Sequence, residues 1–281
     1  MTERSRAATS ALQPGVEIRD LHSHIIDQDM RLFVKLPWRY ERTDARYPVL
    51  YCLDGNRSFS LYAAASLILE TPGTSAQEII VVGVGYQTDS DRIRGLAQWA
   101  AWRTRDLTPV RDAQDEWFWR EKLAALLDGE ELDVQSGGAA QFLESLCQEI
   151  VPFVEANYRA APGDRALAGY SSGGLFTLYT LFHRPDTFTR YFAGSPDMPE
   201  VLFEYEQAYA AAHDDLAARL LITVGGKEAE LLEPIGRMAE RLRTRAYPGL
   251  EVVPQILEGE GHSSGYPAAV SRALCVLYHD Q

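Results

Sequence analysis

One serine of the chain lies in a sequence pattern that can turn its hydroxyl into a nucleophile. Ser171 is the central residue of Gly169-Tyr-Ser-Ser-Gly173, which fits Gly-x-Ser-x-Gly. The residues before the pattern predict a strand and those after it predict a helix, which is the context that this motif requires. A sharp strand-to-helix turn points the central side chain outward, and the glycines on either side relieve the crowding. We therefore predict that Ser171 is a catalytic nucleophile; the alternative is a glycine-rich turn with incidental serines.

A serine hydroxyl is a poor nucleophile unless a base, here a histidine, removes its proton. Among six histidines, His262 follows a predicted strand and lies in the glycine-rich stretch 258–265, which can bring its imidazole over the edge of a sheet. We predict that His262 is the base. The other five have simpler explanations as strand, helix or terminal residues, although a metal-binding pair is conceivable for the first two: His22, His24, His183, His213 and His279.

A carboxylate should hold the imidazole in the correct tautomer and stabilise its charged form. Glu228 follows a predicted strand in a Gly-Gly-Lys-Glu turn, and the chain order Ser171, Glu228, His262 is the order used with this type of nucleophile turn. We predict that Glu228 is the acid. Glu230, two residues later, and Asp197, after another predicted strand, remain open as alternatives.

The negative charge that develops during acyl transfer requires backbone N–H donors near the nucleophile. We predict that the N–H of Ser172, directly after the nucleophile, is one donor. The second should come from the loop after an earlier strand, and Leu53-Asp-Gly-Asn-Arg57 is such a loop. We predict that the N–H of Asn56 is the second donor; the alternative is an Asp-Gly turn without a catalytic part.

The elements that must position these residues alternate between strands and helices along most of the chain. Short apolar runs are typical of buried parallel strands, and apolar stripes in the longer segments predict helices. The predicted strands span Val16–Ile26, Met30–Pro37, Pro48–Leu53, Ile79–Val84, Arg165–Gly169, Thr189–Ala193, Leu220–Val224 and Leu250–Leu257. The predicted helices span Leu61–Glu70, Ala139–Tyr158, Ser172–His183, Glu230–Arg245 and Ala268–Tyr278. This order predicts an α/β fold: a mostly parallel sheet with antiparallel N-terminal strands, helices on both faces, and a site at the carboxyl ends of the strands.

Residues 16–281 are predicted to form one domain, preceded by a flexible tail over residues 1–15. Residues 86–137 are predicted to contain only short helical pieces and to form a lid-like insert, because a long irregular stretch within a compact domain is usually a lid or a binding loop. This segment contains six arginines with four tryptophans interleaved among them: Arg92, Arg94, Arg103, Arg105, Arg111 and Arg120, with Trp99, Trp102, Trp117 and Trp119. They could hold an anionic or aromatic acyl group, or the arginines could pair with nearby acids while the tryptophans pack in the core.

Composition and charge exclude several classes of protein. The 281 residues, 46% of them hydrophobic, can bury a substantial core, and no run of about 18 apolar residues predicts a membrane span. The formal net charge of −13 argues against nucleic acid or an anionic membrane as partner. No secretory signal is recognisable, and three widely spaced cysteines predict neither disulfides nor a metal site. We expect a cytoplasmic protein that needs no metal or organic cofactor; the sequence leaves its oligomeric state open.

Three blocks of the sequence together resemble the putative-esterase family of α/β-hydrolases. They are Tyr47–Asn56, the Gly-x-Ser-x-Gly-Gly block at Gly169–Gly174 and the Gly-His-Ser loop at Gly261–Ser263. The likeness runs from about Val16 to the C-terminus. It implies the α/β-hydrolase fold, with Ser171, Glu228 and His262 as nucleophile, acid and base.

Two further blocks are similar to the siderophore-esterase-like members of that family: Arg103-Thr-Arg-Asp-Leu-Thr-Pro109 and Gly137-Gly-Ala139. The resemblance implies that Arg103 is an active-site arginine that binds substrate. It also implies a serine hydrolase that cleaves a small-molecule carboxylic ester through an acyl-enzyme, with a siderophore-type, enterobactin-like ester as substrate. A broad-specificity carboxylesterase or thioesterase of the S-formylglutathione hydrolase type, or an acyltransferase like the mycolyltransferases, is the alternative with the same chemistry. A catalytically idle binding protein is the alternative of another class.

Overall fold

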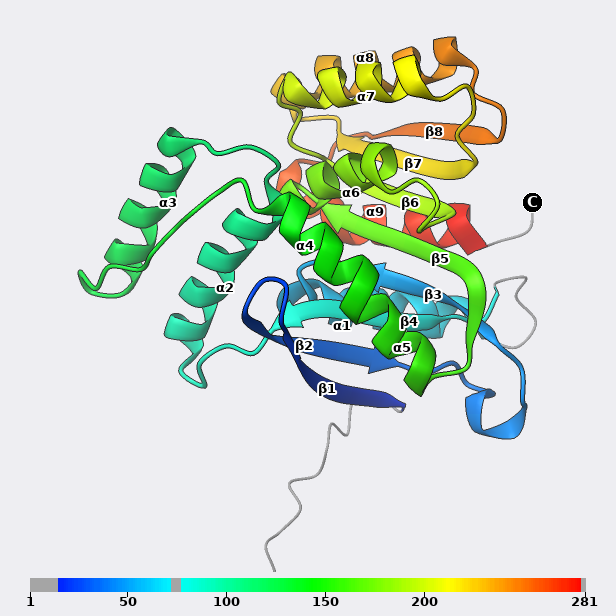
Figure 1. Ribbon diagram of the computed structural model, residues 1–281, viewed down its shortest axis with the longest axis horizontal. Helices are drawn as coiled ribbons and strands as arrows, with labels where there is room; N and C mark the ends of the chain where they lie inside the picture. The colour runs from blue at the N-terminus through cyan, green and yellow to red at the C-terminus, as the bar shows by residue number, and fades with distance from the viewer. Residues whose placement is uncertain (1–14, 72–76, 279–281) are drawn as a thin grey trace, which may run out of the picture.

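The structure is a computed structural model that describes residues 15–71 and 77–278, so the predicted tail over residues 1–15 lies outside the described residues except for Gly15. The described residues form one eight-stranded sheet with helices on both faces (Figure 1). The strands are β1 (Val16–Ser23), β2 (Gln28–Lys35), β3 (Tyr47–Cys52), β4 (Ile80–Tyr86), β5 (Ala160–Tyr170), β6 (Arg190–Gly194), β7 (Ala218–Gly225) and β8 (Leu250–Leu257). The helices are α1 (Gly55–Leu69), α2 (Arg92–Leu107), α3 (Ala113–Leu126), α4 (Ala139–Ser145), α5 (Val151–Asn157), α6 (Ser172–His183), α7 (Val201–Ala212), α8 (Ala229–Arg245) and α9 (His262–Tyr278), with a 3₁₀ turn η1 (Tyr40–Arg42) and a π-helical piece η2 (Leu146–Ile150) between α4 and α5.

Pairing within the sheet is parallel except at its N-terminal edge. The strand order is β1-β2-β4-β3-β5-β6-β7-β8. β1 pairs antiparallel with β2, and β2 with β4, whereas all the other neighbours in this order are parallel. β3 and β4 are buried along their whole length, as expected for strands with helices on both sides. The predicted mostly parallel sheet with antiparallel N-terminal strands and helices on both faces is confirmed.

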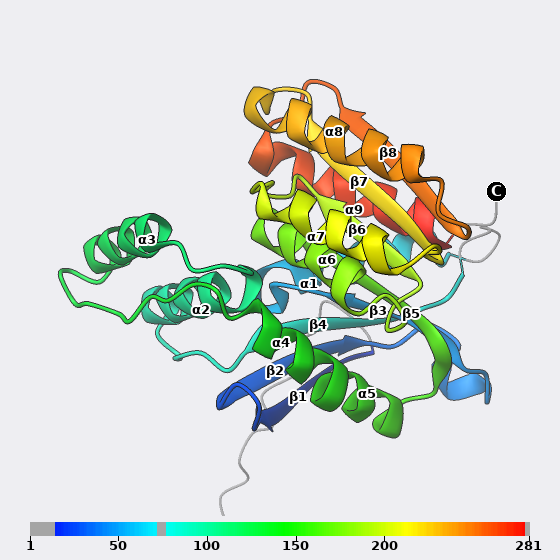
Figure 2. The ribbon, with the colours of Figure 1, turned by 45° about the horizontal axis from the view of Figure 1, so that its top comes forward.

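The helices cover the two faces of the sheet unequally. α1 and α9 pack together on one face, where Phe59, Tyr62 and Leu274 share an apolar cluster with strand residues such as Leu50. α4, α5, α6 and α8 cover the opposite face, and α7 packs on α6 (Figures 1 and 2). Among the described residues, no helix is both long enough and apolar enough to cross a membrane.

Four helices begin at one edge of the sheet, directly after the carboxyl ends of parallel strands. α1 follows β3 with Asp54 as its N-cap, and α6 follows β5 with Ser171 as its N-cap. α8 follows β7 with Glu228 as its N-cap, and α9 begins at His262 after β8. The residues that carry the predicted chemistry therefore lie at helix N-termini, where unpaired N–H groups and the positive end of the helix dipole are found.

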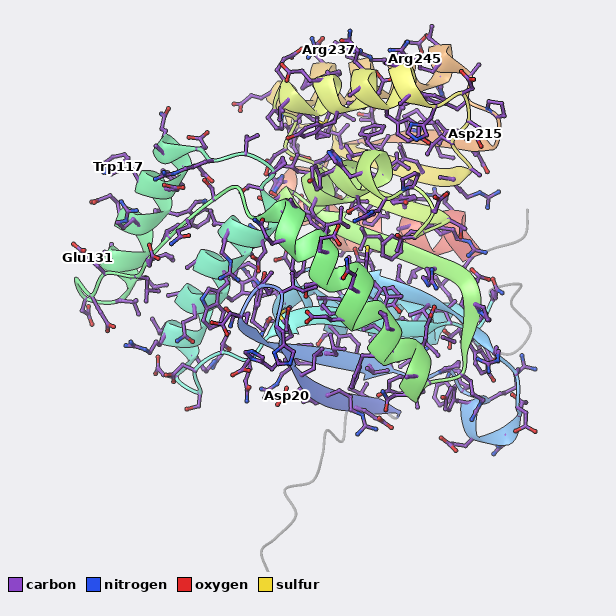
Figure 3. The ribbon with its side chains drawn as sticks, in the orientation of Figure 1. Asp20, Trp117, Glu131, Asp215, Arg237 and Arg245 are labelled. Atoms are coloured by element: carbon purple, nitrogen blue, oxygen red, sulfur yellow. The ribbon has the colours of Figure 1, made fainter. Side chains whose placement is uncertain are left out.

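Residues 86–137 are more regular than the sequence predicts. α2 and α3 account for most of this segment, which projects beside the sheet, and Figure 3 shows Trp117 and Glu131 at its outer side. The prediction of short helical pieces was wrong because the many charged residues obscure the apolar periodicity of α2. Cap residues were the available signal: the Asp91 and Asp112 carboxylates each accept two N–H groups of the helix that follows. The lid function of the segment stays a prediction.

Two of the helices at the site edge also start earlier than predicted. α1 begins at Gly55 rather than at Leu61. α9 begins at His262 rather than at Ala268, and it continues through Pro267. Apolar periodicity missed both starts because the first turns contain few apolar residues, although these turns carry the polar groups of the site.

The turn between β5 and α6 packs its own main chain very closely. A Cβ at Gly169 would lie 2.1 Å from Gly173 O, a distance that no real side chain tolerates. A Cβ at Gly173 would meet its nearest neighbour, Asp54 Oδ2, at an ordinary 3.4 Å, whereas one at Gly174 would lie 2.9 Å from Gly194 O. The crowding predicted at Gly169 is therefore present, but the second crowded position is Gly174 rather than Gly173.

We expect Gly169→Ala to lower the free energy of unfolding by at least about 3 kcal/mol, because the backbone of α6 would have to move. Urea denaturation followed by circular dichroism measures this loss. Gly236→Ala, in the exposed interior of α8 where a Cβ meets nothing, is the matched control and should gain up to about 1 kcal/mol. A Gly169→Ala variant as stable as the parent would contradict the close approach.

Candidate active site

Ser171 joins β5 to α6 in an unusual backbone conformation. Its φ and ψ are 59° and −123°, a region that residues with a Cβ rarely adopt. Its N–H donates to Gly194 O at 2.8 Å and its carbonyl accepts from Leu175 N–H at 3.0 Å. The end of β6 and the first turn of α6 thus hold this strained conformation in place, and the half-buried side chain stands at the carboxyl end of β5.

His262 and Glu228 come from neighbouring turns and form a direct hydrogen bond. His262 Nδ1 lies 2.6 Å from Glu228 Oε1, with the carboxylate almost buried and the imidazole nearly half exposed. The second oxygen, Oε2, accepts from Ser195 Oγ and from the N–H of Gly225, each at 2.7 Å. Burial alone would raise the pKa of the Glu228 carboxyl, but the donors from Ser195, His262 and Gly225 together lower it. Glu228 is therefore an anion at neutral pH, and its two oxygens only accept hydrogen bonds.

The two alternative carboxylates are not brought to the imidazole. Glu230 is exposed in the first turn of α8. Asp197, which follows β6, accepts from Ser172 Oγ at 2.9 Å. Of the three carboxylates that the sequence leaves open, Glu228 is the one that contacts His262.

The His262 imidazole lies against the turn that carries Ser171. The rings of His262 and Tyr170 have their centroids 5.2 Å apart, and Tyr170 Oη donates to His262 O at 2.8 Å. Within the described residues no hydrogen bond joins Ser171 Oγ to His262. Such contacts are often long in resting active sites and shorten when substrate binds.

The first N–H groups of α1 and α6 provide two free donors near Ser171. The N–H groups of Asn56 and Ser172 have no acceptor among the described residues, as is usual in the first turn of a helix. The Asn56 side chain is engaged elsewhere: its Nδ2 donates to Tyr86 O and its Oδ1 accepts from Tyr86 N–H, each at 2.8 Å. This double contact fastens the start of α1 to the end of β4 and so orients the Asn56 N–H.

Arg103, on α2, connects the starts of α1 and α6. Its Nε and Nη2 donate to the two oxygens of Asp54 at 2.7 and 3.0 Å, and its Nη1 lies 3.5 Å from Ser172 Oγ. Burial alone would lower the pKa of this guanidinium, but the Asp54 carboxylate raises it. The guanidinium also lies 5.1 Å from the ring centroid of Trp99. The structure thus places Arg103 at the site, with its charge already paired to Asp54.

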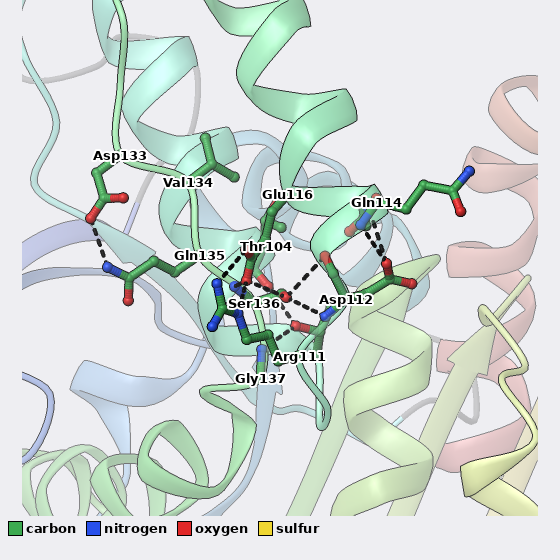
Figure 4. Close-up of polar contacts among 12 residues, drawn as sticks. Thr104, Arg111, Asp112, Gln114, Glu116, Asp133, Val134, Gln135, Ser136 and Gly137 are labelled. Atoms are coloured by element: carbon green, nitrogen blue, oxygen red, sulfur yellow. Dashed lines mark hydrogen bonds and ion pairs between the residues drawn. The ribbon is translucent and has the colours of Figure 1, made fainter.

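Most other arginines of the segment 86–137 pair with local acids. Arg94 pairs with Glu130, Arg105 with Asp106, and Arg111 with Glu116. Figure 4 shows the last pair, in which Glu116 also accepts from the hydroxyl of Ser136. Arg120 donates to a main-chain carbonyl, Val134 O. For these arginines the structure favours local pairing over a shared substrate-binding cluster.

The described histidines other than His262 lie outside this site. His22 hydrogen-bonds to Asp29, and its ring lies edge-on to that of His24. His183 stacks on Tyr179, and His213 lies at the end of α7. The structure shows no cluster of three or more metal-ligating side chains in residues 15–71 and 77–278, and His279 lies outside the described residues.

Three residues that sequence reasoning did not assign to the site contact its members. Ser195 and Tyr170 contact Glu228 and the main chain of His262, as given above, and Asp54 binds Arg103. A signal for Ser195 existed, because it lies two residues after the predicted strand Thr189–Ala193 and was therefore expected at the carboxyl edge of the sheet.

Known proteins resemble this chain in sequence and in fold. The family model described as "Putative esterase" matches residues 23–131 and 128–246. The ferri-bacillibactin esterase BesA of Bacillus subtilis is 28% identical over 99% of this chain and 95% of its own length. The siderophore triacetylfusarinine C esterase of Aspergillus fumigatus is 27% identical over 87% of this chain and 86% of its own length. The crystal structure of the BES protein from Bacillus cereus is similar in fold, with a TM-score of 0.79 and 24% identity over 97% of this chain and 98% of that chain.

We expect Asp54→Asn to lower the free energy of unfolding by about 3 kcal/mol, because it leaves the Arg103 guanidinium buried without a counter-charge. Asparagine tolerates the left-handed backbone of this position, where φ is 58°. Chemical denaturation measures the loss. Glu130→Gln, which breaks the exposed pair with Arg94, is the matched control and should cost less than about 1 kcal/mol. Equal losses for the two variants would show that the Asp54–Arg103 pair is not structural.

Proposed function

Because the chain belongs to the putative esterase family, we propose that it hydrolyses carboxylic esters through an acyl-enzyme formed on Ser171. The observation that carries this proposal is the Glu228–His262 hydrogen bond at 2.6 Å, formed beside a strained turn that presents a serine hydroxyl. A buried anion bonded to one imidazole nitrogen leaves the other nitrogen free to accept a proton.

In the proposed first step Ser171 Oγ attacks the ester carbonyl carbon while its proton passes to His262 Nε2. Glu228 accepts the Nδ1–H, which fixes the tautomer, and its negative charge stabilises the imidazolium. The carbon–oxygen bond of the ester then breaks and the alcohol leaves with the proton from His262. Water attacks the acyl-enzyme with the same base, and the carboxylic acid is released from Ser171.

The tetrahedral intermediates carry a negative oxygen, which we assign to the N–H groups of Asn56 and Ser172. Both groups are free in the described residues, and both lie in the first turn of a helix. The positive ends of the α1 and α6 dipoles therefore point at the same oxygen. Arg103 contributes by holding the two helix starts together through Asp54.

We further propose that α2 and α3 border the acyl-binding side of the site. α2 supplies Arg103, and its Trp99 lies under both Arg103 and Arg57. The first turn of α3 lies close enough that burial, Asp112 and Asp197 raise the pKa of Asp115, while Arg103 lowers it. Indole rings and carboxylates together suit a substrate with aromatic or hydroxyl-bearing groups.

For the substrate we propose a siderophore-type ester. This part of the proposal is supported by the two relatives named above, which are esterases of a ferri-siderophore and of triacetylfusarinine C and which align along nearly the whole chain. The iron of such a molecule is part of the substrate, and the proposed hydrolysis uses the groups of this chain alone.

We expect Ser171→Ala to lower kcat by at least about 10⁴-fold, because the proposed acyl-enzyme forms on the Ser171 hydroxyl. The variant should also lose covalent labelling by a fluorophosphonate while keeping its thermal midpoint, since the backbone strain of residue 171 does not depend on the hydroxyl. Ser66→Ala, which removes a buried serine hydroxyl in the last turn of α1, is the control and should keep full activity and labelling. Hydrolysis at the parent rate by Ser171→Ala would refute the nucleophile.

We expect kcat/KM for an iron-loaded siderophore ester to exceed that for p-nitrophenyl butyrate by at least about 10²-fold, because only the larger substrate contacts α2 and α3. Chromatography of the products of ferri-bacillibactin and of ferric triacetylfusarinine C, beside the chromogenic ester and a short-chain thioester, makes the comparison. Turnover of the simple esters alone would exclude the siderophore assignment and leave a general carboxylesterase.

A further inference from the structure

We propose that Ser195 is a positioning residue of this active site: its hydroxyl holds the Glu228 carboxylate in the orientation that His262 requires. The inference rests on the proposed function, in which Glu228 and His262 act as acid and base. Among the described residues Ser195 forms no hydrogen bond with Ser171 or His262, so its effect has to pass through Glu228.

The backbone at Ser195 shows that this side chain is held at a conformational cost. Ser195 is fully buried after β6, and its φ is 36°. Glycine adopts positive φ freely, whereas serine does so only against steric resistance. Its N–H is fixed by Thr223 O at 2.8 Å on the neighbouring strand β7. A serine kept at a buried, strained position where glycine would fit indicates that the hydroxyl is used.

The hydroxyl has one strong acceptor, the Glu228 carboxylate. Ser195 Oγ lies 2.7 Å from Glu228 Oε2, and because an ionised carboxylate cannot donate, the proton of this bond comes from Ser195. The N–H of Gly225 donates to the same oxygen. Two donors from two strand ends therefore fix Oε2, which leaves Oε1 directed at His262 Nδ1.

Tyr170 ties the same group to the nucleophile turn. Its Oη lies 3.0 Å from Ser195 Oγ and donates to the main-chain carbonyl of His262 at 2.8 Å. Tyr170 directly precedes Ser171 and its ring stacks on Tyr266 of α9, with centroids 4.1 Å apart. Because the Ser195 proton is donated to Glu228 and the Tyr170 proton to His262 O, the two hydroxyls lie close together without a proton between them.

Other charged groups near the pair do not replace Ser195. Glu258 and Glu260 lie on the turn before α9, and Lys227 lies on the turn before α8. The main-chain N–H of Lys227 donates to Glu260 O, and within the described residues none of these three side chains hydrogen-bonds to Glu228. Ser195 is therefore the side-chain donor that fixes Oε2.

The main test is Ser195→Gly, which removes the hydroxyl and suits the positive φ. We expect kcat to fall about tenfold with KM unchanged, and the thermal midpoint not to fall. Without the Ser195 donor the negative Glu228 carboxylate is less stabilised, so the pKa of Glu228 rises. The acid limb of the kcat/KM profile should therefore move up by about one pH unit. Ser195→Ala, which keeps the Cβ, should show the same kinetic changes.

The controls separate positioning from general loss of structure. Ser66→Ala and Tyr191→Phe each remove a buried hydroxyl that does not contact Glu228 by any hydrogen bond in the described part of the chain. Both variants should leave kcat and the pH profile unchanged. Tyr170→Phe should lower kcat without moving the acid limb, because Tyr170 Oη bonds the main chain of His262. The inference would be overturned if Ser195→Gly kept the kcat and the pH profile of the parent. It would also be overturned if kcat fell together with the thermal midpoint while the acid limb stayed in place.

A double-mutant cycle with Glu228→Gln distinguishes this inference from the proposed function. If Ser195 acts through Glu228, Ser195→Gly adds no further loss of kcat to Glu228→Gln. Additive losses would overturn the role of Ser195 while leaving Glu228 as the acid. A Glu228→Gln variant with parent activity would overturn the proposed acid, and the role of Ser195 with it.

Discussion

The approach of Gly173 O to Gly169 is the constraint on which the rest of the site depends. With no Cβ at residue 169, β5 can turn directly into α6, and the turn forces Ser171 into a backbone conformation that projects its hydroxyl from the end of the strand. The same turn leaves the N–H of Ser172 without an acceptor among residues 15–71 and 77–278. One close backbone contact therefore sets the position of a hydroxyl and of a hydrogen-bond donor together, before any other element contributes.

The remaining groups reach this turn because parallel strands end at a common edge. β3 delivers Asn56, β7 delivers Glu228 and β8 delivers His262, each within a few residues of the end of its strand. Side-chain contacts then fix the orientations of the residues that the strands bring to this edge. Asn56 is fastened to β4 through Tyr86, the start of α1 is joined to α6 through Asp54 and Arg103, and Glu228 is bonded from two strand ends. The framework is thus a product of the sheet, while its geometry is refined by buried polar pairs.

Sequence reasoning succeeded where the signal is local. The glycine-flanked serine and the short apolar strands predicted the sheet and the place of the turn. The strand-plus-turn rule selected Glu228, which forms a hydrogen bond with His262, and its role as the acid stays a prediction. It failed where the signal is a contact between distant segments. The pairing of Arg103 with Asp54 spans 49 residues and that of Ser195 with Glu228 spans 33. Neither pairing produces a repeating pattern in the sequence from which it could be predicted. α2 was missed because arginines occupy much of its surface.

The convergence of four helix starts has a consequence for what leaves the site. The chain as a whole is acidic, with a net charge of −13, yet at this edge the positive ends of α1, α6, α8 and α9 come together. Under the proposed mechanism the alcohol departs first as a neutral molecule and the acid departs last as a carboxylate. The positive helix ends that stabilise the negatively charged intermediate also attract the carboxylate product. As this product accumulates, it therefore occupies the site and slows further hydrolysis.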